Sequence, residues 1–492
     1  MLCPILKKNA NHIKQDKMTY FDPLKNKIYF GSTNKLNDWV TDFNDQGKVI
    51  EKIKLMLKNY LELDNVSFLF GTGTSIHLGA VSIRNFPIEV EEYIKEKDEK
   101  NGAVKGIFEE LINAIKLLQA DKLKYGQANL IGETTEFEDE RKWKLYIDSE
   151  IVRDSETKEI VVELERVLNF LIAFDYIQNE DKSTVRSDKT TELIAAIKEG
   201  LFAVCDVDKR VLSDQEKEKI KNRGKEETLK NILKNKYILH EKFVKALLQR
   251  PLNLRRANIF TSNYDLAFEY AFDKLGVFYI DGFAGFHKRY FKPETFEYDI
   301  FYPGSTTAGK VQRIEKVVRY YKLHGSLSWI NSDIRNSNNL YGIEEKPLEL
   351  IDKSEKKGEI IIYPSAVKKS FTLDLPYSEL FRQFSTTINQ SQSVLITVGY
   401  SFGDEHFNDI IYQALSNPTF TLIVVDLGGT KSPYIEELKN LNDPRVIILE
   451  GEYFGDFLTF ADTLMPNFNS VDNNENVANS LNQLFNSKGE AK

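Results

Sequence analysis

Several short segments of the chain combine glycine with side chains suited to holding a phosphate or a ribose. The first runs Gly71-Thr-Gly-Thr-Ser75 and directly follows the apolar run Val66–Phe70. A strand that ends in closely spaced glycines lets the backbone approach a pyrophosphate, because no Cβ atoms stand in the way. The pattern predicts that Gly71, Thr72, Gly73 and Ser75 contact a dinucleotide. A tight turn without a ligand is the alternative interpretation.

Two further segments place an amide, a carboxylate and an imidazole directly after apolar runs. Asn263 and Asp265 follow the run at 257–261, and His324-Gly325 follows the run at 317–323. Ligands of open α/β sheets bind beyond the carboxyl ends of the strands, so these side chains are candidates for the chemistry. An imidazole at such a position can act as a general base. The alternative for Asn263 and Asp265 is capping of the next helix.

Two later segments supply groups suited to a nucleoside. Gly399 and Ser401 follow the run at 394–398, and Asp426 ends the next run with a carboxylate of the kind that accepts ribose hydroxyls. Asp404 is predicted to cap the helix that follows it. His77 is expected to line the pocket, whereas the polar surroundings of His240 predict a surface position.

The elements that must position these residues alternate between apolar runs and amphipathic stretches. Near-continuous apolar strands that alternate with helices predict an α/β fold, in which a doubly wound, Rossmann-like parallel sheet is covered on both faces. The predicted strands are 66–70, 257–261, 277–280, 317–323, 359–363, 394–398, 419–425 and 446–449. The predicted helices include 51–63, 266–275, 377–388, 405–415 and 435–441.

Composition divides the chain into five parts. An N-terminal strap is predicted over 1–50, the first part of the Rossmann-like domain over 51–86, and a large helical insertion over 87–250. The remainder of the domain is predicted over 251–465, and a polar tail over 466–492. Within the insertion, the charge-rich stretch Glu216–Lys236 is predicted as one helix.

Overall composition narrows the classes of function. The 492 residues carry a net charge of −8, which argues against a protein that coats nucleic acid or an anionic membrane. Two cysteines cannot build a four-cysteine zinc site or a disulfide framework, so no metal is expected. The uncharged runs are too polar for membrane spans. We therefore expect a cytoplasmic protein without membrane association.

These motifs, taken in order, resemble the sirtuin superfamily. Its first motif is Gly-Ala-Gly-x-Ser, with a Gly four residues later and an Arg five beyond, and the matching residues here are Gly71, Gly73, Ser75, Gly79 and Arg84. The Gln-Asn-x-Asp, His-Gly and Gly-x-Ser motifs of the family correspond to 262–265, 324–325 and 399–401. The Asn-Tyr-Asp form and the stretch 399–406 look most like the bacterial antiphage-defence branch, which includes sirtuin-like partners of HerA-type ATPases.

The resemblance implies that NAD is the substrate and assigns roles to the site. Asn263 would orient water or ribose, Asp265 would contact the nicotinamide amide, and His324 would accept a proton. Arg84 would support the pyrophosphate, and Gly399, Ser401 and Asp426 would hold the adenosine half. Deacetylating sirtuins have Pro-Asp-Phe where this chain has Val-Ser-Ile at 81–83. That Phe shields the reactive sugar from water, so its replacement favours hydrolysis of NAD to nicotinamide and ADP-ribose.

Regulation and partners are expected from the same resemblance. An ungated NAD hydrolase would deplete its own cell, so we expect a homo-oligomer, with a HerA-type ATPase as a candidate partner. Contact with nucleic acid is expected to be weak or indirect, through the basic stretches 250–256 and 287–291. The competing hypotheses are protein deacylation or ADP-ribosyl transfer, an NAD-binding subunit without catalysis, and nucleic-acid processing.

Overall fold

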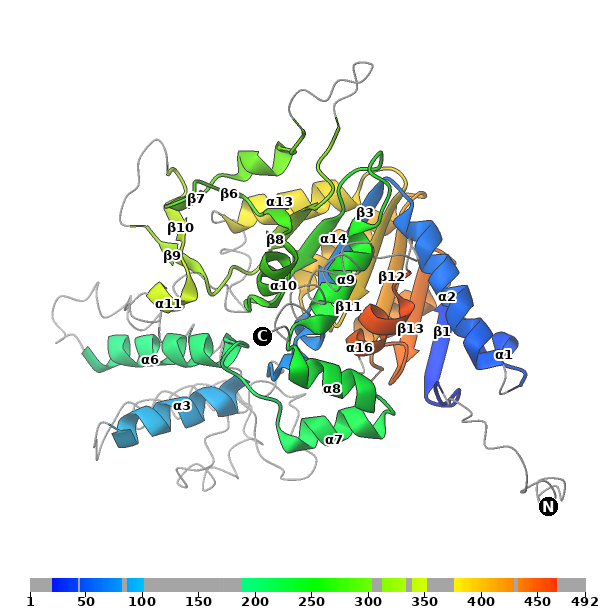
Figure 1. Ribbon diagram of the computed structural model, residues 1–492, viewed down its shortest axis with the longest axis horizontal. Coiled ribbons are helices and arrows are strands. Elements are labelled where there is room, and N and C mark those ends of the chain that lie inside the picture. The colour runs from blue at the N-terminus through cyan, green and yellow to red at the C-terminus, as the bar shows by residue number, and fades with distance from the viewer. Residues whose placement is uncertain are drawn as a thin grey trace, which may run out of the picture.

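A large sheet forms the centre of the molecule in the computed structural model (Figure 1). The structure describes residues 20–42, 45–81, 86–100, 168, 171, 188–302, 312–332, 339–351, 376–428 and 432–466. Within these residues the sheet has nine strands. Their order is β2 (Thr33–Asn34), β1 (Asn26–Phe30), β13 (Val446–Gly451), β12 (Thr421–Asp426), β11 (Ser393–Val398), β3 (Asn65–Phe70), β4 (Asn258–Thr261), β8 (Val317–Lys322) and β5 (Phe278–Ile280).

The chain winds outward from β3 in two directions. It passes first to β4 and β8, then returns to β11 beside β3 and continues to β12 and β13. All neighbouring pairs from β13 to β5 are parallel, and β1 adds an antiparallel edge beside β13. This is the doubly wound strand order, and the direction reverses between β3 and β11. The predicted fold class is confirmed.

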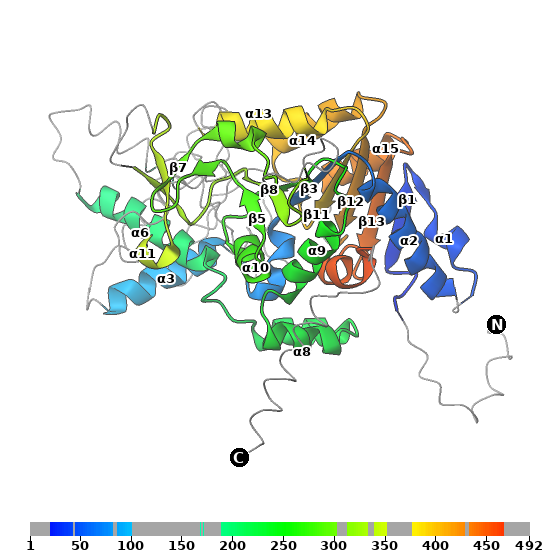
Figure 2. The same cartoon turned by 45° about the horizontal axis from the view of Figure 1, so that its top comes forward.

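Helices cover both faces of this sheet, as Figures 1 and 2 show. One face packs against α2 (Gln46–Leu61), α9 (Ile238–Leu248), α10 (Ala267–Leu275) and α16 (Phe457–Thr459). The other packs against α13 (Tyr377–Ile388), α14 (Glu405–Leu415) and α15 (Pro433–Asn440). In β3, Phe68 and Phe70 enter the first core and Leu69 enters the second. Because both faces are buried, the strands read as continuous apolar runs.

A small antiparallel sheet, which the sequence analysis did not predict, lies beyond the β8 side of the large sheet. Its order is β6 (Phe283–Ala284), β7 (Arg289–Phe291), β10 (Ile343–Glu345) and β9 (Trp329–Asn331). Phe283 packs on Phe291 and on Trp329, with ring centroids 5.4 and 5.1 Å apart. Arg289 bridges the buried carboxylate of Asp281 and the partly buried carboxylate of Glu345. Aromatic packing and this ion cluster hold the small sheet together.

The ion cluster predicts how stability depends on pH. Burial, with the neighbouring Asp281 carboxylate, raises the pKa of Glu345 to about 8, while Arg289 opposes the shift. The folded state therefore holds a proton that the unfolded chain releases near pH 4.5, so stability falls as pH rises from about 4.5 to 8. We expect Glu345→Gln to lessen this fall by about 1–3 kcal/mol. Urea unfolding at pH 5.5 and 8.5 measures the difference, and an unchanged pH dependence would contradict it.

The described part of the predicted helical insertion begins with two helices that pack side by side away from the large sheet (Figure 1). These are α3 (Phe86–Lys100) and α6 (Asp188–Cys205), and Lys97 pairs with Glu199 between them. The single helix predicted over Glu216–Lys236 is wrong. The chain instead forms α7 (Asp214–Asn222) and α8 (Glu226–Lys234), because Gly224 at φ +71° breaks the helix between them.

The ends of the chain differ in what the structure describes. Inside the predicted N-terminal strap, β1 and β2 join the large sheet, and α1 (Leu36–Trp39) follows them. The predicted polar tail lies outside the described residues from 467 onward, as do most of 101–187 in the predicted insertion and the predicted strand at 359–363. Among the helices that are described, none is both long and apolar enough to cross a membrane.

Candidate active site

One row of paired residues crosses the carboxyl end of the sheet and aligns the candidate site. Val425 pairs with Val398, Val398 with Phe70, Phe70 with Thr261, and Thr261 with Lys322. The strands β12, β11, β3, β4 and β8 therefore end at the same level. The candidate residues that follow this row within two positions are Asp426, Gly399, Gly71, Asn263 and His324.

The glycines after β3 and β11 let two turns touch at the point where the sheet reverses direction. A Cβ atom on Gly71 or Gly73 would lie 2.6 Å from backbone atoms of Gly399. Gly71 N–H donates to Val398 O and Gly73 N–H donates to Gly399 O, at 3.1 and 3.0 Å. These glycines thus have a packing role whether or not a ligand binds.

Most backbone N–H groups of the glycine-rich turn, which the sequence predicts to contact a pyrophosphate, donate hydrogen bonds within the protein. It folds into two short 3₁₀ segments, η3 (Thr72–Thr74) and η4 (Ile76–Leu78). The N–H groups of Thr74 and Ser75 close the first segment onto Gly71 O and Thr72 O. Since four N–H groups of Gly71–Ser75 donate within the protein, a ligand would meet this turn at the partly exposed Thr72 and Gly73.

Asn263 connects the turn after β4 to the turn after β3. Its Nδ2 lies 3.1 Å from Gly71 O and 3.2 Å from both Thr74 Oγ1 and Ser75 Oγ. The side chain is 7% exposed, and its Oδ1 is buried without a hydrogen-bond partner. A buried polar atom left unpaired is costly, so it marks a place where a ligand hydroxyl or water can donate.

The Asp265 carboxylate accepts hydrogen bonds from two segments, the start of α10 and the glycine-rich turn. Its Oδ1 accepts the N–H of Ala267, the first residue of α10, at 3.1 Å, although the N-cap residue of that helix is Leu266 and not Asp265. The Ser75 hydroxyl also donates to it. Burial raises the pKa of the Asp265 carboxyl, while the positive charge of Lys322 opposes that shift. Asp265 therefore ties the start of α10 to the glycine-rich turn.

Lys322, which the sequence analysis did not single out, binds the backbone of the loop that carries Asp265. Its Nζ donates to the carbonyls of Tyr264 and Asp265, and it lies 3.0 Å from Glu269 Oε1. Tyr320 donates its hydroxyl to the other Glu269 oxygen at 3.0 Å. A lysine at the end of an otherwise apolar strand was the available signal. The buried charge is paired, as burial requires.

His324 lies against the start of α14. Its Nε2 is 3.0 Å from Asp404 Oδ2, and its ring stacks on Phe407 with centroids 5.1 Å apart. Asp404 Oδ1 accepts the N–H of His406 at 3.1 Å, which confirms the predicted helix cap. The pairing with His324 was not predicted. The pairing requires the segment after β11 to extend across the ends of β3 and β4, the two strands that separate β11 from β8.

The remaining predicted residues occupy the β11 and β12 ends or fall outside the described part. Gly399 has φ +62°, and Ser401 is exposed. Asp426 is buried and accepts the N–H of Gly428 at 3.0 Å. Arg84 lies outside the described residues.

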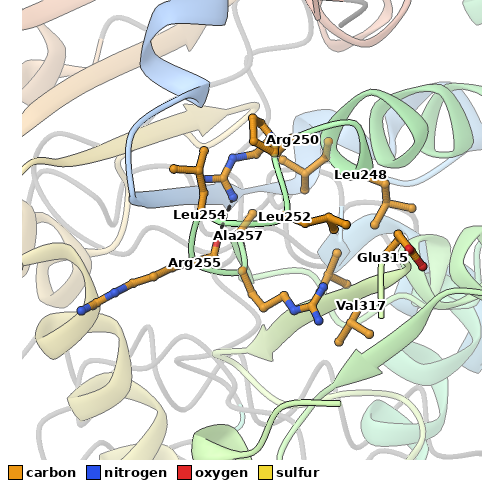
Figure 3. A pocket seen from close by; sticks show the side chains of 12 residues that line it. Leu248, Arg250, Leu252, Leu254, Arg255, Ala257, Glu315 and Val317 are labelled. Carbon is orange, nitrogen blue, oxygen red and sulfur yellow. Dashed lines mark hydrogen bonds between the residues drawn. The ribbon is translucent and has the colours of Figure 1, made fainter. Parts of the chain in front are cut away.

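Figure 3 shows a small cavity at the opposite, amino-terminal edge of β4 and β8. Its volume is about 30 Å³, and arginines from the basic stretch 250–256 line it. Arg250 donates to the carbonyls of Leu61, Leu63 and Arg255, and Arg256 pairs with Asp299. The guanidinium groups of Arg250 and Arg256 are thus engaged within the fold, which weakens the argument that this stretch contacts nucleic acid.

Two buried histidines pack behind the glycine-rich turn. The rings of His77 and His240 stack 5.4 Å apart, and all four ring nitrogens are without hydrogen-bond partners. Phe457 and Phe268 flank them. The prediction of a surface position for His240 is wrong. Its helix turns it inward with Phe243, Val244 and Leu247, the spacing of one helical face. His77 is 2% exposed and faces this apolar cluster.

This histidine pair predicts loss of stability in acid. Burial lowers the pKa of His77 to about 4 and also lowers the pKa of His240, with Asp456 and Lys236 acting on His77 in opposite directions. The unfolded chain therefore binds protons that the folded chain does not, and stability falls as pH drops below about 6.5. For His77, the difference in pKa between the unfolded and folded chain corresponds to a loss of about 3 kcal/mol in the free energy of unfolding by pH 4.

We expect His77→Phe to reduce the loss of stability that occurs as the pH drops below about 6.5. Urea unfolding at pH 7.5 and 4.5 measures it, with the exposed His287 changed to Gln as the matched control. Equal acid sensitivity in the wild type and in His77→Phe would contradict the assignment.

The fold and this edge define a doubly wound α/β protein with polar groups gathered where such folds bind dinucleotides. Residues 257–425 match the family model of the SIR2-like domain, which supports a sirtuin-like assignment for this part of the chain. The matched part contains Asn263, Asp265, His324, Gly399 and Ser401. SIR2-like domains use NAD, so the match indicates an NAD-related activity. No curated protein matches the chain.

The described part of the chain contains no candidate metal site. Among those residues, no group of three or more His, Cys, Asp or Glu side chains is placed to hold an ion. Cys205, which is buried, is a free thiol whose pKa burial raises.

Proposed function

We propose that the chain hydrolyses NAD to nicotinamide and ADP-ribose. The observation that carries the proposal is the unpaired, buried Oδ1 of Asn263, at the sheet edge where His324 also lies. The register of Thr261 with Lys322 places both residues two positions beyond paired strand ends. An amide oxygen that lacks a donor, at the same sheet edge as an imidazole, suits a ribose hydroxyl or a water molecule.

The chemistry needs little acid catalysis. In NAD the nicotinamide nitrogen is already cationic, so cleavage of its bond to the ribose releases neutral nicotinamide with the bonding electron pair. The ribose carbon develops positive charge, water adds to it, and one proton is lost. Asn263 would orient the ribose or the water, and His324 would accept the proton.

The other residues would hold the substrate in place. Asp265, which already accepts from the Ala267 N–H and the Ser75 hydroxyl, would contact the nicotinamide amide through a remaining lone pair. Thr72 and Gly73 would meet the pyrophosphate, and Gly399, Ser401 and Asp426 the adenosine half, with Arg84 and Ser75 in support. The positions of the β11 and β12 ends on one row with β3 support this division.

The test is to identify the products. The purified full chain is incubated with NAD in ¹⁸O-labelled water, with and without an acetyl-lysine peptide. We expect equal amounts of nicotinamide and ADP-ribose, with the label in ADP-ribose and no effect of the peptide. Nicotinamide release that requires the peptide would show deacylation instead. Tight NAD binding without turnover, alone and with candidate partners, would contradict hydrolysis.

We further propose that hydrolysis is gated and serves antiphage defence by depleting NAD. The sequence resemblance supports this role, together with a homo-oligomer and a HerA-type ATPase partner. The insertion helices α3 and α6, which stand away from the sheet, are candidate assembly surfaces. Subunit number and NAD turnover measured together, with and without the ATPase, test the proposal. Turnover that is full and constant in the isolated monomer would contradict gating.

A further inference from the structure

We propose that Asp404 is a positioning residue that sets the tautomer and orientation of His324 for NAD cleavage. This inference rests on the proposed function, and it assigns to Asp404 a role beyond capping α14. Asp404 Oδ2 lies 3.0 Å from His324 Nε2, while Oδ1 accepts the N–H of His406. Both oxygens of one carboxylate are thus committed to fixed partners.

The surroundings hold this carboxylate in one place. Asp404 and His324 are 6% and 7% exposed, so the contact is largely shielded from solvent. The Tyr400 hydroxyl lies 3.2 Å from Asp404 O and from Asn408 Oδ1, and Asn408 Nδ2 donates to Phe402 O at 2.9 Å. Phe402 itself has φ +55°, a strained conformation for a residue with a side chain. The segment after β11 is therefore locked in a conformation that delivers Asp404.

The pairing has a chemical consequence for the imidazole. A carboxylate accepts hydrogen bonds and cannot donate them, so it places the ring proton on Nε2. The lone pair that accepts a proton then belongs to Nδ1. Phe407 stacks on the ring and limits its rotation. Asp404 therefore decides which nitrogen acts as the base, and it stabilises the imidazolium that forms when His324 takes the proton.

Asp404→Asn separates this role from helix capping. The Asn keeps the volume and an oxygen for the N–H of His406, so its NH₂ group is left facing His324 Nε2. That group donates, so Nε2 must become the acceptor and the ring proton moves to Nδ1. We expect kcat for nicotinamide release to fall about 10²–10⁴-fold, with KM within about threefold and the fold intact.

Asp456→Asn is the matched control. Asp456 caps α16 through Leu458 N–H at 3.1 Å, the same distance as the Asp404 cap, and it is similarly buried. It pairs with Lys225 and not with His324. A structural effect of losing a buried capping carboxylate would lower thermal stability in both variants. We expect kcat to fall in Asp404→Asn and to stay unchanged in Asp456→Asn.

The direct readout is the tautomer of His324, measured by ¹⁵N NMR of the full chain labelled at its six histidines. His324→Gln assigns the signal. We expect the Nε2–H form in the wild type and the Nδ1–H form in Asp404→Asn. A wild-type Nδ1–H form, an unchanged tautomer in the variant, or an equal loss of kcat in Asp456→Asn would overturn the inference. Absence of turnover in the wild type would overturn the proposed function, and the tautomer would still decide the role of Asp404.

Discussion

Asn263→Ala is expected to lower the rate of nicotinamide release from NAD by about 10²–10³-fold. The change removes the buried Oδ1, which is the oxygen available to orient the ribose or the water. Because we propose that the adenosine half of NAD binds at other residues, we expect the dissociation constant of NAD to change far less than the rate. Nicotinamide release and NAD binding by calorimetry, measured on the same protein, separate the two effects.

The control for Asn263 must address its second role in holding the glycine-rich turn. Thr74→Val removes one of the three acceptors of Asn263 Nδ2 and leaves Oδ1 in place. A small effect on rate in Thr74→Val, beside a large one in Asn263→Ala, would assign the loss to Oδ1. Equal nicotinamide release by the wild type and Asn263→Ala would remove Asn263 from the mechanism.

His324→Gln is expected to reduce kcat by about 10²–10⁴-fold, the usual contribution of a general base. Glutamine can still donate to Asp404 and fill most of the space against Phe407, so the start of α14 should keep its structure. It offers no nitrogen that accepts a proton near neutral pH. The steady-state rate of nicotinamide release measures the effect, and KM is expected to stay within a few-fold.

His287→Gln is the matched control for this variant. His287 is exposed and lies outside the predicted site, so its replacement should leave the rate unchanged. A comparable loss in both variants would point to a general effect of removing histidine. Full activity in His324→Gln would show that another group, or solvent, takes the proton.

The sequence predicted the central sheet well because its strands are buried on both faces. Continuous apolar runs such as Val394–Val398 have no other stable place in a chain of this composition. The predicted bounds of the helices at 377–388 and 405–415 coincide with the observed ones. The second of these begins at an aspartate that caps it, which is a local signal.

Other features depend on contacts that no local pattern encodes. The strands of the small sheet have two or three residues each, too few for an alternating pattern to stand out. The His324–Asp404 pair joins residues that are 80 positions apart and that follow two strands, β8 and β11, which are not neighbours in the sheet. The charged residues Glu241 and Lys242 after His240 favour a surface position, although its spacing to Val244 and Leu247 follows one buried helical face.

The glycine-rich turn illustrates the limit of motif reasoning in the site. The spacing of Gly71 and Gly73 after a strand predicts a cradle for phosphate. The structure shows the same glycines making room for Gly399, with most of the N–H groups engaged inside the protein. Sequence spacing alone cannot distinguish these roles, because both require a residue without a Cβ atom.

The central claim is that Asn263 and His324 meet one ribose at the carboxyl edge of the sheet. A crystal structure of His324→Gln with NAD tests it most directly, because the slowed variant should retain the intact dinucleotide. We expect the nicotinamide ribose between Asn263 Oδ1 and residue 324, with the pyrophosphate at Thr72 and Gly73. A dinucleotide bound elsewhere on the chain, or turned so that its adenosine lies against Asn263, would contradict it.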